Sequence, residues 1–212
     1  MKKTIIFDFD GTVVDNFDVI LPIFNVLAVK YAKRDLSDLS VEEIKSRTGP
    51  QIIKYIGIPF WRIPRAIAAA RSEFYKVADQ VKVFENIPEV LLELKKTAFI
   101  GIVTSNSSKN IEIMLKSNNI NYFDFVSTKS KLFKKHNNLK KVIRDRALKS
   151  DLENNRVVYI GDEIRDIEAA KRVGMPIISV TWGYNSADAL KRFNPTYLAE
   201  DPKDIIKIVD EM

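Results

Sequence analysis

Two acidic side chains follow a short apolar run near the start of the chain, in the segment Asp8-Phe9-Asp10-Gly11-Thr12. Asp8 and Asp10 lie two residues apart at the end of a predicted strand, so their carboxyl groups point to the same side. One carboxylate at such a place can attack phosphorus to form an aspartyl-phosphate. The other, kept protonated because the two groups repel each other, can protonate the leaving alkoxide and later take a proton from water. The pair therefore predicts covalent chemistry on phosphate esters, and Gly11 permits the sharp turn that an approaching phosphate needs.

Positive charge is the next requirement, because a phosphate dianion is repelled by carboxylates. A hard cation such as Mg²⁺, bound by carboxylates and water, removes that repulsion. Asp162 and Asp166, four residues apart near a predicted helix start, share one face and are the further candidate ligands. A cationic side chain is also expected at the transferring group. Hydroxyl and backbone N–H groups at a helix N-terminus should hold the phosphoryl oxygens, which suits Thr104, Ser105 and Asn106.

The elements that must position these groups alternate between strands and helices. Strands are predicted at residues 4–7, 99–103, 125–126, 156–160, 176–180 and 196–198. Helices are predicted at residues 89–96, 110–117, 139–148, 164–173, 187–193 and 204–211. This alternation predicts an α/β fold, a Rossmann-like parallel sheet flanked by helices and joined by right-handed crossovers. Because ligands bind beyond the carboxyl ends of parallel strands, we expect Asp8, Asp10, Thr104, Ser105 and Asp162 at one edge of the sheet.

A helical segment interrupts this pattern. Apolar residues recur at helical spacing between Val14 and Tyr31, and Ser40 with Glu43 forms a capping box at the start of another helix. Further helices are predicted at residues 51–56 and 67–77, and no strand is predicted between them. We therefore expect an α/β core domain of residues 1–14 and 82–212 with an inserted, small, all-helical domain of residues 15–81.

The composition excludes several classes of protein. The 212 residues suit one domain with a smaller insert, and 46% hydrophobic with 29% charged residues is ordinary globular composition. The absence of cysteine excludes disulfide scaffolds, thiolate zinc sites and cysteine nucleophiles. Apolar runs too short for a signal peptide or a membrane span predict a soluble, cytoplasmic protein without a membrane partner. Nucleic acid is not favoured as a partner, because the basic segment 129–149 contains a single aromatic residue, Phe133.

Over nearly its whole length the chain resembles the haloacid dehalogenase-like hydrolase superfamily, especially its phosphoglycolate-phosphatase-like branch. Three of its motifs are matched by residues 8–15, 102–106 and 159–166. The resemblance implies that Asp8 is the nucleophile and that Asp10 is the general acid and base, with its backbone carbonyl on the metal. It further implies that the hydroxyl of the second motif binds phosphate, a role that we assign to Thr104 with Ser105 as the alternative.

The resemblance also implies the rest of the site. Asp162 would bind Mg²⁺ directly, with Asp166 supporting it, so that the expected metal site uses these two residues together with the first motif. A lysine shortly before a helix would contact the phosphate. The candidates are Lys131, Lys134 and Lys135, of which Lys135 best matches the placement in the family.

The helical insert resembles the cap that follows the first motif in this branch, which closes over the site and selects the substrate. Within it, Arg47 is expected above the phosphate, where it could grip a second anionic group. The resemblance therefore predicts a Mg²⁺-dependent phosphatase for small phosphorylated metabolites, with phosphoglycolate as one candidate substrate, acting as a monomer or homodimer. A phosphomutase of the same fold and a catalytically silent binding protein are the alternatives. A dehalogenase is disfavoured, because such relatives lack the second aspartate and need no metal.

Overall fold

The computed structural model describes residues 2–32, 34–128 and 135–212. In these residues six strands form a parallel sheet with the order β5-β4-β1-β6-β7-β8. The strands are β1 (Lys3–Phe7), β4 (Ala98–Val103), β5 (Phe125–Ser127), β6 (Val157–Gly161), β7 (Ile177–Val180) and β8 (Tyr197–Ala199). Each lies where the sequence predicts a strand, and the α/β prediction is confirmed.

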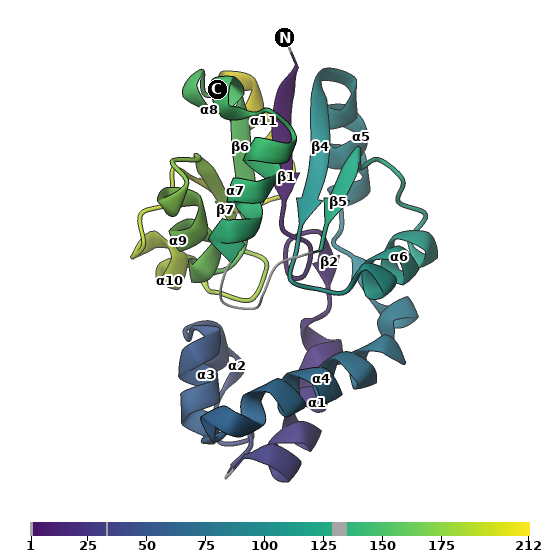
Figure 1. Ribbon diagram of the computed structural model, residues 1–212, viewed down its shortest axis with the longest axis vertical. Helices are drawn as coiled ribbons and strands as arrows, with labels where there is room; N and C mark the ends of the chain where they lie inside the picture. The colour runs from purple at the N-terminus through teal and green to yellow at the C-terminus, as the bar shows by residue number, and fades with distance from the viewer. Residues whose placement is uncertain (1, 33, 129–134) are drawn as a thin grey trace.

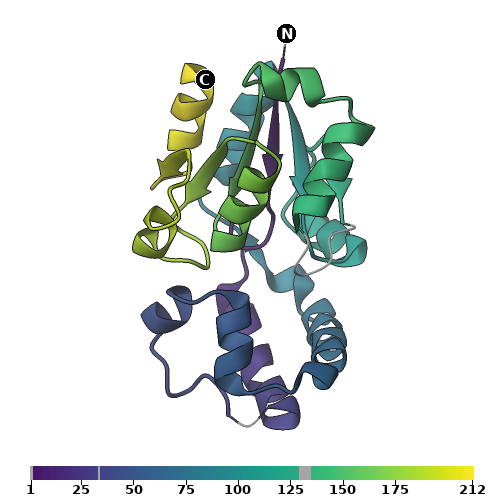
Figure 2. The same cartoon turned by 60° about the vertical axis from the view of Figure 1, so that its left-hand side comes forward.

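Helices cover both faces of the sheet (Figures 1 and 2). The helices of the α/β part are α5 (Ile87–Thr97), α6 (Ser108–Ser117), α7 (Lys135–Asp145), α8 (Lys149–Glu153), α9 (Ile164–Arg172), α10 (Ala187–Lys191) and α11 (Asp204–Glu211). Ile5 and Phe7 of β1 pack in one buried cluster with residues of α5, α6 and α11. Ile6, which points to the other face, packs with residues of α7, α9 and α10. Burial on both faces explains why β1 is apolar at every one of these positions.

Five helices begin two to four residues earlier than the sequence analysis predicts, namely α3 (Gly49–Ile56), α4 (Ile63–Tyr75), α5, α6 and α7. Pro64 and Pro88 lie in the first turns of their helices, where the missing N–H is tolerated, so α4 begins at Ile63 and α5 at Ile87. Helix α7 begins at Lys135 instead of residue 139. This last difference matters for function, because it puts Lys135 in the first turn of a helix that packs on the sheet.

A two-stranded antiparallel ribbon, β2 (Val14–Asp15) with β3 (Lys82–Val83), leads into and out of the helical segment. Between the two strands lie α1 (Phe17–Tyr31), α2 (Val41–Lys45), α3 (Gly49–Ile56), η1 (Phe60–Arg62), α4 (Ile63–Tyr75) and η2 (Ala78–Gln80). The segment lies beyond the carboxyl ends of the sheet strands, with α1 packed against α4 (Figure 1). The capping box of Ser40 and Glu43 is present. The division of the chain into domains at residues 15 and 81 remains a prediction.

Among the described residues, no helix is both long and apolar enough to cross a membrane.

Candidate active site

Three buried carboxylates meet beyond the carboxyl end of the sheet. Asp8 follows β1, Asp162 follows β6, and Asp166 lies in the first turn of α9. One oxygen of each lies within 4.8 Å of the others. The three residues are 2%, 0% and 0% exposed, respectively. The fold therefore collects, from distant parts of the sequence, three of the four acidic residues that the sequence analysis assigns to a metal.

Lys135 supplies the positive charge at this cluster. Its Nζ lies 2.6 Å from Oδ2 of Asp8 and 2.5 Å from Oδ1 of Asp166, and the side chain is 3% exposed. The lysine reaches the cluster from the first turn of α7, which packs beside α9. The other two candidates, Lys131 and Lys134, lie outside the described residues. Lys135, the candidate that best matches the family placement, thus lies at the carboxylates in the described part of the chain.

Burial dominates the electrostatics of these groups. It raises the pKa of Asp8 from 3.8 to about 7, although Lys135 acts in the opposite direction. Burial, followed by the charges of Glu163 and Asp166, raises the pKa of Asp162 well above its usual value. Burial opposes the charged form of Lys135, but the carboxylates of Asp166 and Asp8 outweigh it and raise the lysine pKa. Of the three buried carboxylates, Asp8 and Asp166 thus pair with the ammonium group of Lys135.

This donor set fits Mg²⁺. All three side chains offer carboxylate oxygens, the ligands that Mg²⁺ prefers over nitrogen or sulfur. A divalent cation would neutralise the excess of negative charge, and it would favour the ionised forms of Asp8 and Asp162, whose pKa values burial raises. The side chain of Asp10 is not part of this group of ligand atoms.

The carboxyl group of Asp10 is held in a separate set of hydrogen bonds. Asn16 Nδ2 donates to its Oδ1 at 2.6 Å, and Asn106 Nδ2 donates to the same oxygen at 2.9 Å. Thr104 Oγ1 donates to Oδ2 at 3.4 Å. Burial raises the pKa of Asp10, and the hydrogen bonds from Asn106 and Asn16 only partly offset this effect. Asp8 and Asp10 therefore occupy different environments. Asp8 lies among carboxylates and a lysine, whereas Asp10 lies among neutral amide groups.

The polar residues after β4 divide between two positions. Thr104 is fully buried, and its hydroxyl oxygen accepts a hydrogen bond from the backbone N–H of Asn106 at 3.0 Å. Ser105 instead lines a cavity toward the helical segment, and its carbonyl accepts a hydrogen bond from Arg71 Nη2 at 3.3 Å. Thr104 is thus in contact with Asp10, whereas Ser105 faces the helices.

Glycine permits the close approach of three loops around Asp162. Gly11 has φ +77°, and a Cβ on it would lie 2.3 Å from Oδ2 of Asp162. A Cβ on Gly183, in the loop after β7, would lie equally close to the same oxygen. In this tight space the Asp162 carboxylate accepts hydrogen bonds from Thr12 Oγ1 and from the backbone N–H of Tyr184, both at 2.7 Å. These bonds fix the orientation of Asp162.

Arg47 lies in the helical segment, in the lining of the same cavity as Ser105. Its Nη1 donates to the carbonyl of Glu43 at 2.5 Å, and its guanidinium lies 5.7 Å from the ring centroid of Tyr55. Asn185, in the loop after β7, donates through Nδ2 to the carbonyls of Lys45 and Arg47 at 2.8 and 3.0 Å. This link joins the α/β part to the loop that contains Arg47.

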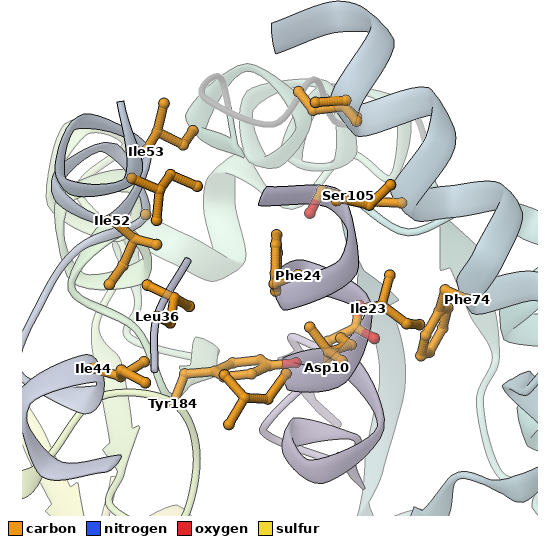
Figure 3. Close-up of a pocket in the computed structure, with 18 of the residues that line it drawn as sticks. Asp10, Ile23, Phe24, Leu36, Ile44, Ile52, Ile53, Phe74, Ser105 and Tyr184 are labelled. Carbon is orange, nitrogen blue, oxygen red and sulfur yellow. The ribbon is translucent and has the colours of Figure 1, made fainter. Parts of the chain in front are cut away.

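Two cavities reach the site. The first, of about 330 Å³, extends from Asp10, Ser105 and Asn106 into the helical segment (Figure 3). The second, of about 290 Å³, is bordered by Lys135 and by polar residues of α9. Arg165 lines both cavities. The site is therefore approached on one side through apolar helices and on the other through charged residues.

Sequence reasoning missed several residues of this arrangement. They are Thr12, Asn16, Arg165, Tyr184 and Asn185. Asparagines in loops are common and carry no spacing signal of their own. The available hint was Gly183, which lies between Trp182 and Tyr184, since glycine after a buried strand often marks a close approach.

The chain is similar to known hydrolases in both sequence and fold. The family model described as haloacid dehalogenase-like hydrolase matches residues 5–180. A phosphoglycolate phosphatase of Synechococcus elongatus is 27% identical over 212 residues, covering 99% of this chain and 98% of that protein. Pyrophosphatase PpaX of Oceanobacillus iheyensis is 26% identical over 215 residues, covering 99% and 97%. A crystal structure of a predicted phosphatase from Clostridium acetobutylicum has the same fold, with a TM-score of 0.84, 23% identity and full coverage of both chains.

Proposed function

Because the chain belongs to the haloacid dehalogenase-like hydrolase family, we propose that it is a Mg²⁺-dependent phosphatase that hydrolyses small phosphate monoesters through an aspartyl-phosphate on Asp8. The observation that carries the proposal is the buried meeting of Asp8, Asp162 and Asp166 with Lys135. The names of the relatives, a phosphoglycolate phosphatase and a pyrophosphatase, support phosphate transfer to water as the reaction class.

Asp8 attacks the substrate in the first step. An oxygen of its carboxylate forms a bond to phosphorus while the bond from phosphorus to the ester oxygen breaks. Lys135 lies 2.6 Å from Oδ2 of Asp8 and supplies positive charge for the oxygens of the transferring group. Thr104, or in its place Ser105, contributes a hydroxyl to the same oxygens. These residues orient the phosphoryl group.

Asp10 moves the proton. Burial raises its pKa, which favours the protonated form that the first step needs. Its proton passes to the leaving oxygen as the ester bond breaks. In the second step water attacks phosphorus, Asp10 takes a proton from that water, and inorganic phosphate leaves with Asp8 restored. Asn16 and Asn106 hold the carboxyl group in place during both steps.

The metal site would be formed by Asp8, Asp162 and Asp166, with Asp10 contributing its backbone carbonyl. Bound there, Mg²⁺ would neutralise the phosphate and the carboxylates so that the two can approach. Arg47 would lie on the substrate side, within the helical segment that we propose as a cap.

A panel of phosphate esters with and without Mg²⁺ tests this proposal. We expect release of inorganic phosphate that requires Mg²⁺ and that falls roughly 10⁴-fold or more in Asp8→Asn. The exposed Asp210→Asn in α11, which lies toward the opposite end of the sheet (Figure 1), is the matched control and should retain activity. Activity that survives in Asp8→Asn would show that Asp8 is not the nucleophile. Inactivity of the wild type on the whole panel would favour a silent binding protein, whereas isomerised sugar phosphates without phosphate release would favour a phosphomutase.

A further inference from the structure

The cavity between the α/β part and the helical segment has an unusual wall for a site that binds anions. From the helical segment its lining is isoleucine, leucine, phenylalanine and alanine for the most part, with Arg47 and Arg71 as the charged residues among those described. Figure 3 shows Ile52 and Ile53 of α3 on one side and Phe24 of α1 facing them. The cavity of about 330 Å³ falls in the size range of small-ligand sites, about 300–1,000 Å³.

Apolar faces of three helices line this cavity. Helix α1 packs against α4, and Ile52, Ile53 and Ile56 present one face of α3 to the same space. Phe24 is 43% exposed although it points inward. Large apolar side chains left in contact with water are destabilising, so an apolar occupant of this space would be bound favourably.

The cavity reaches the reacting groups from the side of the leaving group. Asp10, the proposed acid for the ester oxygen, lines it, together with Asn106 and Ser105. Asp8, Asp162 and Asp166, the residues of the phosphoryl and metal side, are not in its lining. A substrate with its phosphoryl group at Asp8 would therefore direct its alcohol portion past Asp10 into the apolar space.

We propose that the preferred substrates are phosphate monoesters of apolar alcohols, with an alkyl, isoprenoid-like or aromatic group of a size that fills this cavity. The inference rests on the proposed phosphatase activity and adds the chemical class of the leaving group. A leaving group that carries its own carboxylate, as in phosphoglycolate, would put a second charge among isoleucine and phenylalanine side chains, which is unfavourable without a partner. Of the three arginines in the lining, Arg47 and Arg71 already bind the backbone carbonyls of Glu43 and Ser105, and Arg165 is paired with the carboxylate of Glu163.

The size of the expected preference for longer alkyl groups follows from the hydrophobic effect. Each methylene group removed from water contributes on the order of 0.8 kcal/mol, which corresponds to about a fourfold change in kcat/KM. The rise of kcat/KM with chain length should stop when the alkyl group fills the cavity. A series of linear alkyl phosphates from methyl to decyl, measured with Mg²⁺ by release of inorganic phosphate, therefore reports the length and character of the cavity.

Two matched pairs of variants connect the series to this cavity. Phe24→Asn should lower the ratio of kcat/KM for hexyl phosphate to that for methyl phosphate about tenfold. Val26→Asn, on the same helix but 67% exposed and outside the lining, should leave the ratio as in the wild type. Ala70→Leu, which extends a lining residue of α4, should make the gain stop about three carbon atoms earlier. Ala68→Leu, at an exposed position of the same helix, should leave the chain length at which the gain stops unchanged.

The outcomes separate this inference from the proposed function. A rise with chain length that levels off, and that Phe24→Asn reduces, supports the inference. Equal kcat/KM from methyl to decyl phosphate, or a preference for phosphoglycolate over hexyl phosphate, would overturn it while the Asp8-dependent phosphatase remained. If no ester were hydrolysed, the proposed function would fail, and calorimetric binding of methylphosphonate and hexylphosphonate with Mg²⁺ would still decide the inference. Tighter binding of hexylphosphonate would support it, and equal binding would overturn it.

Discussion

The α/β part and the helical segment use their apolar residues in different ways. In β1, Ile5, Ile6 and Phe7 are fully buried and packed from both sides of the sheet. In α1, Leu27 and Ala28 are buried, but Phe24, which lines a cavity, is 43% exposed and Val26 is 67% exposed. A close-packed interior holds side chains in fixed positions, whereas loosely packed helices can adapt or move. We therefore propose that the α/β part positions the reacting groups and that the helical segment receives the variable portion of the substrate.

The polar contacts repeat this difference. Asp162 accepts hydrogen bonds from Thr12 and Tyr184 of the α/β part. Asp10 accepts hydrogen bonds from Asn106 of the α/β part and from Asn16 at its border. The helical segment is tied to the α/β part through few polar contacts, among them those of Asn185 with Lys45 and Arg47. Substitutions in the rigid part should therefore act on the chemical step, and those at the link should act on substrate capture.

The largest effect after loss of the nucleophile is expected for Asp10→Asn. An amide cannot donate a carboxylic proton, so kcat should fall about 10²–10⁴-fold on alkyl phosphates. The loss should be much smaller on p-nitrophenyl phosphate, whose phenolate leaves readily without a proton. Steady-state kinetics on the two substrates checks this. An equal loss on both would mean that Asp10 does not act as the acid.

Lys135→Gln should come next. Removal of the ammonium group that stabilises the transferring charge should lower kcat/KM about 10²–10³-fold. It also leaves buried carboxylates without their cation, which should destabilise the metal-free protein by about 3–5 kcal/mol. Thermal unfolding and kinetics measure the two effects, and Mg²⁺ should restore part of the stability. Lys140→Gln, at an exposed lysine on the same helix, is the control. If it behaved like Lys135→Gln, a specific role for Lys135 would be untenable.

The metal-free protein should lose stability as the pH rises. The folded pKa of Asp8 is raised from 3.8 to about 7, so the folded protein holds more protons than the unfolded chain between about pH 4 and pH 7. Its Tm should fall across that range by at least about 2–4 °C, which is roughly 1 kcal/mol in a protein of this size. Mg²⁺ should offset the fall, because it binds the ionised carboxylates.

Asp8→Asn supplies the control for that pH dependence. With no carboxyl group to ionise at position 8, the slope of Tm against pH should be shallower, while the exposed Asp210→Asn should keep the wild-type slope. A wild-type slope in Asp8→Asn would mean that this carboxyl group is not the source of the instability.

The smallest effect is expected at the link between the two parts. Asn185→Ala removes the donor to the carbonyls of Lys45 and Arg47 and should raise KM a few fold, on the order of the 1 kcal/mol of one or two hydrogen bonds. The ratio of kcat for good and poor leaving groups should stay unchanged, since Asp10 is untouched. The exposed Asn154→Ala is the control for an asparagine substitution. A change in kcat without one in KM would mean that the link acts on the chemistry itself.

The sequence predicts the α/β fold and the meeting of the acidic residues for the same reason. Buried strands are apolar and short, and polar residues directly after them, such as Asp8, Thr104 and Asp162, must meet at one edge of a parallel sheet. Lys135 was harder to choose among neighbouring lysines, because the selection depends on where α7 begins, and helix starts are weakly encoded when no capping residue marks them.

The bonds of Asn16 and Asn185 and the cavity between the helices could not be predicted from the sequence, because they form between separate elements of the chain. Asn16 bonds to Asp10 from the start of the helical segment, and Asn185 bonds to a loop about 140 positions earlier. The apolar periodicity of α1 and α3 predicts helices but not whether their faces meet each other or a cavity. That outcome depends on tertiary packing, in which α1 pairs with α4 and one face of α3 lines a cavity.

The central claim is that Asp8 carries the phosphoryl group during turnover, and chemical trapping tests it most directly. Wild-type protein turning over p-nitrophenyl phosphate with Mg²⁺ would be quenched in acid, reduced with borohydride and digested. The account predicts homoserine at position 8, the reduction product of an aspartyl-phosphate, and none in Asp8→Asn or without substrate. Homoserine at another aspartate, or steady turnover with an unmodified Asp8 peptide in every quenched sample, would contradict it.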